Sequence, residues 1–304
     1  MSEFITINDV GPRDGLQNQP KILTPQQRLQ LIQALVDAGL PSIEFGAFVS
    51  PKAVPAMAGA DEIARQLPND KGVHFNALIP NRRGYDNARA VGVQAMGLVV
   101  AASDTMNEKN IRMNTEAAVA VCAEVLEQAQ ADGVQVNVYV ATAWECPFQG
   151  ATDPHQVVTL SRQLIDLGAH QVVISDTIGA AHPGQVRSLM EALLQHLAPE
   201  QIACHFHDTR AMGLANAYAA VEAGIRHLDA SIGGLGGCPF APGATGNVAT
   251  EDLVMMLTQM GFETGINLDK LLAAGQLAGQ LTGAATGGRA YPWLSRNTHR
   301  LQVA

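Results

Sequence analysis

The residues best suited to chemistry lie in the last third of the chain, where two histidines are spaced two positions apart. His205 and His207 lie in the segment Cys204–Asp208. Side chains alternate across a β-strand, so both imidazoles would lie on one face of a strand. Two imidazoles on one face, at the end of an apolar strand, can form half of a metal site. For an isolated pair, one packed and one solvated histidine would be the better interpretation.

A glycine-rich segment with one cysteine follows the histidines and favours the functional interpretation. Glycines at 233, 234, 236 and 237 directly precede Cys238. This density of glycine is typical of a mobile lid rather than a packed core. In a lid, Cys238 would act as an acid or base, whereas a buried free thiol is the structural alternative. Asn247 follows, and its local sequence fits a ligand and a helix N-cap equally well.

Charged residues also lie at the ends of other apolar segments. After the first segment, Asp14 could ligate a metal and Arg13 could stabilise an oxyanion, although Pro-x-Asp-Gly is also ordinary turn sequence. Glu44 lies inside an apolar segment, where an acid is costly unless it is paired or functional. An ion pair between Glu44 and Arg13 is the structural alternative, and it is compatible with catalysis. Asp176 ends a later segment, and Asp208 could orient one of the histidines.

Together these residues predict a divalent metal site. Asp14, His205, His207 and Asn247 would form a mostly hard ligand set with open coordination positions. Such a set suits Mg²⁺ or Mn²⁺, with waters or substrate oxygens completing an octahedron. Zinc stays an alternative, because three histidines or several thiolates would favour it more strongly.

The elements that position these residues alternate between short apolar runs and longer helical patterns. Glycines 39, 92, 133, 168 and 224 separate helical patterns from the next apolar run, which is typical of βα units. The eight expected strands are Phe4–Val10, Ser42–Phe45, Val73–Ile79, Val93–Ala101, Val134–Thr142, Gln171–Ser175, Ile202–His207 and Leu228–Ile232. The clearest helices are expected at Pro25–Ala38, Thr115–Ala131, Pro154–Leu167, Pro183–Leu197 and Asn216–Ala223. Eight units in about 250 residues predict an α/β fold of the (β/α)8 TIM-barrel type, with a doubly wound sheet as the alternative.

No linker divides the chain, so we expect one domain over residues 1–304. The barrel would cover about residues 4–250. Residues 251–304 would add a C-terminal helical cap that includes Glu251–Met260 and Leu268–Leu281. In such a barrel, the active site lies where the strands end and the βα loops begin.

The composition excludes several classes of function. The 304 residues are 47% hydrophobic and carry a net charge of −9 with 5% aromatics, which argues against a nucleic-acid partner. The four cysteines form no C-x-x-C pair, a pattern typical of a reduced cytoplasm. The N-terminus resembles neither a signal peptide nor a membrane span. We therefore expect a cytoplasmic protein with no membrane partner.

Five segments together resemble the 3-hydroxy-3-methylglutaryl-CoA lyase family, within the metal-dependent lyase and condensing TIM-barrel superfamily. They are Val10–Asn18, Phe48–Lys52, Asp176–Gly179, His205–Thr209 and Gly234–Ala241. The resemblance spans about residues 4 to 280. The cysteine segment is specific to the lyases, whereas the Arg-Asp and His-x-His segments are shared with the condensing synthases.

The resemblance implies a role for each candidate residue. The metal would be held by Asp14, His205, His207 and Asn247, and catalysis would use Arg13, Glu44, Asp176, His205 and Cys238. Substrate binding would involve Arg13, Gln17, Ser50 and Lys52. The implied reaction cleaves a CoA thioester to acetyl-CoA and acetoacetate, chemistry of leucine degradation and ketone-body formation. The Gly- and Ala-rich tail would suit the face of a homodimer.

Two segments near the expected site depart from the family pattern. These are Phe45–Ala47 and Arg210–Gly213. Because Arg210 would suit another carboxylate, citramalyl-CoA or a longer 3-hydroxyglutaryl-CoA is an alternative substrate. A condensing acyltransferase and a non-enzymatic barrel that binds a metal or a CoA ester are the competing functions.

Overall fold

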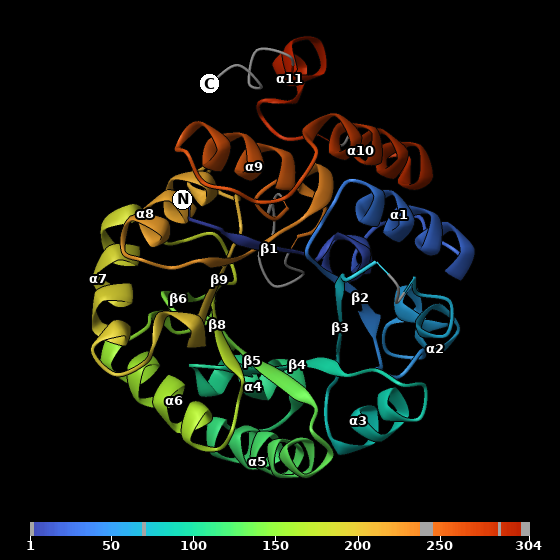
Figure 1. Ribbon diagram of the computed structural model, residues 1–304. Coiled ribbons are helices and arrows are strands. Elements are labelled where there is room, and N and C mark those ends of the chain that lie inside the picture. Colours follow the sequence, from blue (N-terminus) through green and yellow to red (C-terminus); the bar gives the residue numbers. More distant parts are fainter. Residues whose placement is uncertain (1–2, 69–70, 238–245, 285–286, 299–304) are drawn as a thin grey trace.

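The chain forms a closed barrel of eight parallel strands surrounded by helices, as Figure 1 shows in the computed structural model. The structure describes residues 3–68, 71–237, 246–284 and 287–298. Around the barrel, the strand order is β1-β10-β9-β8-β5-β4-β3-β2, and β1 pairs with both β10 and β2. The predicted (β/α)8 barrel is therefore confirmed, and closure rules out the doubly wound sheet.

The barrel strands are short and largely buried. They are β1 (Thr6–Asp9), β2 (Ser42–Ala47), β3 (His74–Leu78), β4 (Ala95–Ala101), β5 (Gln135–Ala141), β8 (Gln171–Asp176), β9 (Ile202–Phe206) and β10 (His227–Ala230). Every residue of β2, β8 and β9 is buried, because parallel barrel strands contact helices outside and side chains inside. A separate hairpin joins β6 (Glu145–Cys146) to β7 (Gly150–Ala151).

One helix follows each barrel strand, and further helices lie between or beyond these. The ring consists of α1 (Pro25–Asp37), α2 (Ala60–Ala64), α3 (Arg82–Arg89), α5 (Thr115–Asp132), α6 (Pro154–Asp166), α7 (Pro183–Leu194), α8 (Gly213–Glu222) and α9 (Thr250–Gln259). The additional helices are α4 (Asp104–Ile111), α10 (Leu268–Thr282) and α11 (Tyr291–Asn297). In Figure 1, α9 completes the ring beside α8, α10 lies between α9 and α1, and α11 lies outside. None of the helices in the described part of the chain is long and apolar enough to cross a bilayer.

Local sequence explains where the first helix begins. Thr24 Oγ1 accepts a hydrogen bond from the Gln27 amide at 3.2 Å, and the Gln27 side chain accepts one from the Thr24 amide at 2.9 Å. This capping box, with Pro25 at the first helical position, satisfies amides that a helix start would leave unpaired.

The structure differs from the sequence-based expectation near the histidines. Helix α8 begins at Gly213 rather than Asn216, because Asp208 Oδ1 accepts a hydrogen bond from the Gly213 amide at 2.8 Å. Strand β9 ends at Phe206 rather than His207, and His207 forms an isolated antiparallel bridge with Asn247. Helices α4 and α11 and the β6–β7 hairpin were not anticipated. Their local patterns are too short and polar to stand out.

Candidate active site and metal centre

The end of β1 leads into a five-residue π-helix, Gly11–Gly15, that carries Arg13 and Asp14. Such turns are rare and are found frequently at functional sites. A side chain on Gly11 would place its first carbon 2.7 Å from both Asp9 Oδ1 and Ile232 Cγ2. The turn can therefore pack against Ile232, in the loop after the neighbouring strand β10, only because this position is a glycine.

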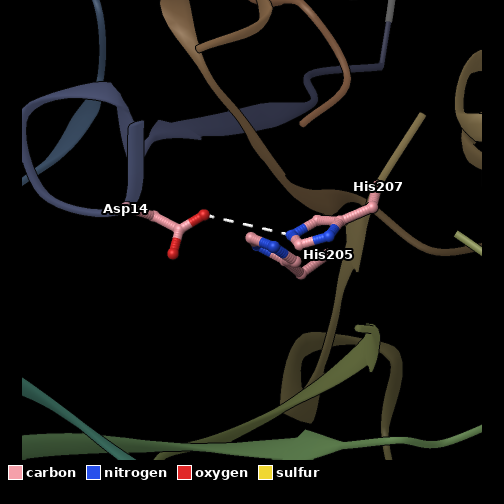
Figure 2. A group of neighbouring side chains, drawn as sticks. All are labelled: Asp14, His205 and His207. Atoms are coloured by element: carbon pink, nitrogen blue, oxygen red, sulfur yellow. Dashed lines mark ion pairs between the residues drawn. The ribbon is translucent and has the colours of Figure 1, made fainter. Parts of the chain in front are cut away.

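Three side chains meet at the C-terminal end of the barrel. One ligand atom from each of Asp14, His205 and His207 lies within 4.8 Å of the other two. Asp14 Oδ2 is 4.0 Å from His207 Nε2, and the two imidazole centroids are 5.2 Å apart. Figure 2 shows the Asp14 carboxylate pointing at both rings from the opposite side. Closure of the barrel brings these residues together, since β10 lies between the strands that carry them.

His205 is oriented by Asp229 of β10, a residue that the sequence analysis missed. His205 Nδ1 lies 3.0 Å from Asp229 Oδ2, which leaves Nε2 as the free nitrogen. Asp208 is the residue that the sequence offered for orienting a histidine, and its Oδ1 accepts a hydrogen bond from the Gly213 amide at 2.8 Å. The one sequence signal for Asp229 was an acid inside the apolar segment Leu228–Ile232.

Asn247 lies against the same cluster. Its Nδ2 donates to Asp14 Oδ2 at 2.8 Å and to the Leu235 carbonyl at 3.0 Å. Its Oδ1 is buried and has no hydrogen-bond partner among the residues that the structure describes. The helix N-cap alternative is wrong, because the N-cap of α9 is Ala249.

These groups fit a hard divalent cation. The cluster offers one carboxylate, two imidazoles and a buried amide oxygen that has no partner in the described part of the chain, and buried polar atoms are normally satisfied. Oxygen and imidazole ligands in this combination suit Mg²⁺ or Mn²⁺.

The charges around the cluster keep it ready to bind a cation. Burial alone would raise the pKa of Asp14, but Arg13 and the two histidines outweigh it and lower this pKa to about 2. Burial, together with the neighbouring His205, lowers the pKa of His207 to about 4. Burial also opposes protonation of His205, yet the hydrogen bond and charge of Asp229 raise its pKa overall. At neutral pH the cluster therefore presents an ionised carboxylate and a neutral His207.

Arg13 joins the cluster to a second buried acid. Arg13 Nε donates to Glu44 Oε2 at 2.7 Å, and Arg13 Nη1 donates to Asp14 Oδ1 at 2.8 Å. Burial raises the pKa of Glu44 to about 7, against the lowering effect of the guanidinium. Glu44 Oε1 is buried, and no described residue forms a hydrogen bond with it. The expected ion pair is therefore present, and it leaves one Glu44 oxygen available for a proton.

Asp176 lies at the end of β8 with both oxygens occupied. Its Oδ1 accepts from the Ala180 amide at 2.8 Å, and its Oδ2 accepts from the Ala181 amide at 3.1 Å. Burial raises its pKa to about 6 despite these hydrogen bonds. Asp176 therefore shapes the loop after β8 while keeping a proton affinity close to neutral pH.

The remaining predicted residues lie further out. Gln17 is half-buried just after the π-helix, and Ser50 and Lys52 are exposed on the connection after β2. No hydrogen bond or ion pair in the described part of the chain joins Ser50 or Lys52 to the cluster. Cys238 lies outside the described residues, so its role stays a prediction from the sequence.

Gly236 packs directly on two of the candidate ligands. A first side-chain carbon at Gly236 would lie 2.4 Å from Asn247 Nδ2 and 3.5 Å from Asp14 Oδ2. The backbone φ of Gly236 is 130°, a value that favours glycine. The glycine-rich segment therefore lets the backbone approach the cluster closely at this position.

Replacing Gly236 with alanine is expected to lower Mn²⁺ affinity by about 10-fold or more, since displaced ligands and their partners cost about 10- to 100-fold. Titration calorimetry with chelator-treated protein would measure the change. Gly224→Ala is the matched control, because Gly224 also has a positive φ, 105°, but has no atom within 4 Å of an added carbon. Equal losses in the two variants would attribute the effect to backbone strain alone.

Comparison with known proteins assigns the family. The model of the HMGL-like family matches residues 4–278. The chain is 41% identical to hydroxymethylglutaryl-CoA lyase of Pseudomonas mevalonii, over 95% of this chain and 96% of the relative. It is 43% identical to (R)-citramalyl-CoA lyase of Chloroflexus aurantiacus, over 90% and 89%. An HMG-CoA lyase structure from Acinetobacter baumannii, in complex with coenzyme A and 3-methylmalate, superposes with a TM-score of 0.92 at 39% identity, over 97% and 96%. The chain therefore belongs to the HMGL-like family.

Proposed function

We propose that the chain cleaves 3-hydroxy-3-methylglutaryl-CoA to acetyl-CoA and acetoacetate with the help of Mg²⁺ or Mn²⁺. The observation that carries the proposal is the cluster of Asp14, His205 and His207 beside the Arg13–Glu44 pair, in a chain of this family. A carbon–carbon lyase needs an activated hydroxyl and a stabilised enolate, and these groups are suited to both.

The reaction moves one proton off oxygen and one onto carbon. The tertiary hydroxyl loses its proton, the C2–C3 bond breaks, and the electron pair moves to the thioester as an enolate. The new ketone leaves as acetoacetate, and protonation of the enolate carbon yields acetyl-CoA. A cation held by Asp14, His205, His207 and Asn247 would act as a Lewis acid that lowers the pKa of the substrate hydroxyl.

Enolate stabilisation and proton transfer fall to different side chains. Arg13 has a third guanidinium nitrogen, Nη2, besides the two that donate to Glu44 and Asp14. This buried donor is placed to meet the enolate oxygen. Glu44 and Asp176, with pKa values near 7 and 6, are matched to proton transfer at neutral pH. Cys238 stays the sequence-based candidate for the group that protonates carbon.

The relatives support a CoA thioester as the substrate. The solved relative was determined in complex with coenzyme A, and both curated relatives are named for acyl-CoA cleavage. The citramalyl-CoA lyase at 43% identity makes (R)-citramalyl-CoA the second candidate. The two substrates share the tertiary alcohol and differ by one methylene before the distal carboxylate. A pocket discriminates by only about 10- to 200-fold on one methylene, so the two activities can coexist.

Parallel assays of the purified protein separate the two candidates. With Mg²⁺ or Mn²⁺, we expect acetyl-CoA and acetoacetate from 3-hydroxy-3-methylglutaryl-CoA, at a higher kcat/KM than for (R)-citramalyl-CoA, which would yield pyruvate. A higher kcat/KM for (R)-citramalyl-CoA would move the physiological substrate to that thioester. Net condensation of acetyl-CoA with a keto acid, without cleavage, would favour the synthase alternative instead.

Arg210 does not stand free beside the site. Its Nη2 lies 3.3 Å from Glu145 Oε1 of β6, and the Arg210 side chain is 51% exposed. Recognition of an extra substrate carboxylate by Arg210 would therefore compete with this ion pair. The homodimer and the cytoplasmic location stay predictions from the sequence; light scattering of the purified protein tests the first.

A further inference from the structure

His205 belongs to a hydrogen-bonded chain that runs through the barrel interior. Asp229 Oδ1, the oxygen that does not face His205, accepts from Asn8 Nδ2 at 2.9 Å. Asn8 Oδ1 accepts in turn from Ser42 Oγ at 2.8 Å and from Asn76 Nδ2 at 2.9 Å. The chain therefore crosses five adjacent strands, β9, β10, β1, β2 and β3.

The donors and acceptors of this chain have a fixed direction. Because Asn8 Oδ1 accepts two hydrogen bonds, its amide nitrogen is the group that faces Asp229. Asp229 is only 6% exposed and, as a carboxylate, can only accept. His205 Nδ1 must then carry the proton of the bond to Asp229, and in the neutral imidazole Nε2 keeps its lone pair for the cluster.

The end of the hydrogen-bond network that is remote from His205, at Asn8, Ser42 and Asn76, lies beside a polar cavity and not in the apolar core. A cavity of about 200 Å³ at the N-terminal end of the barrel is lined by Asn8, Ser42, Asn76 and Asp229, together with polar residues at the strand starts. This cavity lies on the opposite side of Asp229 from the Asp14–His205–His207 cluster. Asp229 therefore lies between a polar chamber and the candidate metal centre.

We propose that Asp229 is a positioning residue, which with Asn8 fixes the tautomer and orientation of His205 so that Nε2 faces the metal. The inference rests on the proposed function for the identity of the site. Outer partners of metal-bound histidines typically contribute about 10- to 100-fold in metal affinity.

Asp229→Asn is the sharpest single test. The substituted amide keeps the size of Asp229, but its NH₂ group places a donor where the hydrogen-bond network needs an acceptor. An amide nitrogen at position 229 would face either the Asn8 donor or His205 Nδ1–H. We expect Mn²⁺ affinity to fall by about 10- to 100-fold in titration calorimetry. Binding within about two-fold of wild type would overturn the proposal.

A compensating exchange and a matched control separate orientation from damage to the barrel. The double variant Asn8→Asp with Asp229→Asn restores a consistent set of donors and acceptors. The new carboxylate at position 8 would accept from Ser42, Asn76 and the new amide at position 229, and the oxygen of that amide would accept from His205. This double variant is expected to regain most of the lost affinity, and a double variant as weak as Asp229→Asn would overturn the orientation argument. Val172→Ala, at a fully buried core position of β8, loosens the barrel and is expected to keep wild-type affinity.

The tautomer of His205 can also be measured in the wild-type protein, which avoids any effect of a substitution on folding. In ¹⁵N-histidine-labelled, Mg²⁺-loaded protein, long-range NMR correlations should show His205 with its proton on Nδ1. A proton on Nε2 instead would overturn the proposal. A wild type that binds Mn²⁺ with this tautomer, but leaves every thioester intact, would sink the proposed reaction and leave the positioning role standing.

Discussion

Replacing Arg13 with methionine is expected to lower kcat by about 10²- to 10³-fold, the usual cost of losing one preorganised donor to a developing oxyanion. The guanidinium is buried and bonded to Glu44 and Asp14, so solvent cannot replace it at the reacting centre. The measurement is kcat for thioester cleavage at saturating Mn²⁺, with the metal affinity measured separately.

The Arg13–Glu44 pair would weaken the folded state when broken, so stability needs its own control. Arg13→Met with Glu44→Gln removes both charges and is expected to regain thermal stability while kcat stays low. Because Glu44 is itself proposed to transfer a proton, the double variant controls for stability, and turnover that returned together with stability would contradict the catalytic roles of both residues. A loss of kcat below about 10-fold in Arg13→Met would contradict the role in enolate stabilisation.

Replacing His207 with alanine is expected to reduce Mn²⁺ affinity by more than about 100-fold, since losing a direct ligand should exceed the cost of losing an outer partner. His207 Nε2 faces Asp14 Oδ2 at 4.0 Å, a separation that a shared cation would bridge. Titration calorimetry of chelator-treated protein gives the affinity, and kcat should fall with it at fixed metal concentration.

The matched control is His196→Ala, because His196 is exposed on the connection after α7. It is expected to bind Mn²⁺ as the wild type does. If His207→Ala kept wild-type metal content after dialysis, the ligand assignment would fail even if turnover were lost.

The sequence predicts the parts of the site that lie within one strand or one turn. A period of two places His205 and His207 on one side of the chain, and an acid in an apolar strand requires a partner. The cost of burying an acid predicts the Glu44–Arg13 pair, in which Arg13 Nε lies 2.7 Å from Glu44 Oε2. Both inferences depend only on local geometry and on the cost of burying charge.

The register between neighbouring strands is harder to predict, because the spacing along the sequence does not show which residues come to lie side by side. Asp229 and His205 pair in register across β10 and β9, but no spacing along the chain indicates this. Asp208 is nearer to the histidines in sequence, but its Oδ1 accepts the Gly213 amide at the start of α8, and the carboxylate seen on His205 is that of Asp229. The competing demand of an unpaired amide at a helix start took priority there.

Asn247 is a second residue whose role cannot be decided from the local sequence. Its local sequence fits an N-cap, but the bridge between His207 and Asn247 holds this residue beside Asp14 and delays the helix until Thr250. A tertiary pairing, and not local propensity, decides its role.

The most direct test of the account is turnover of 3-hydroxy-3-methylglutaryl-CoA by chelator-treated protein as Mn²⁺ is added back. We expect no acetoacetate without metal, a rise in rate that saturates near one Mn²⁺ per chain, and loss of the activity with EDTA. Undiminished acetoacetate release in the presence of EDTA would contradict a metal centre at Asp14, His205 and His207.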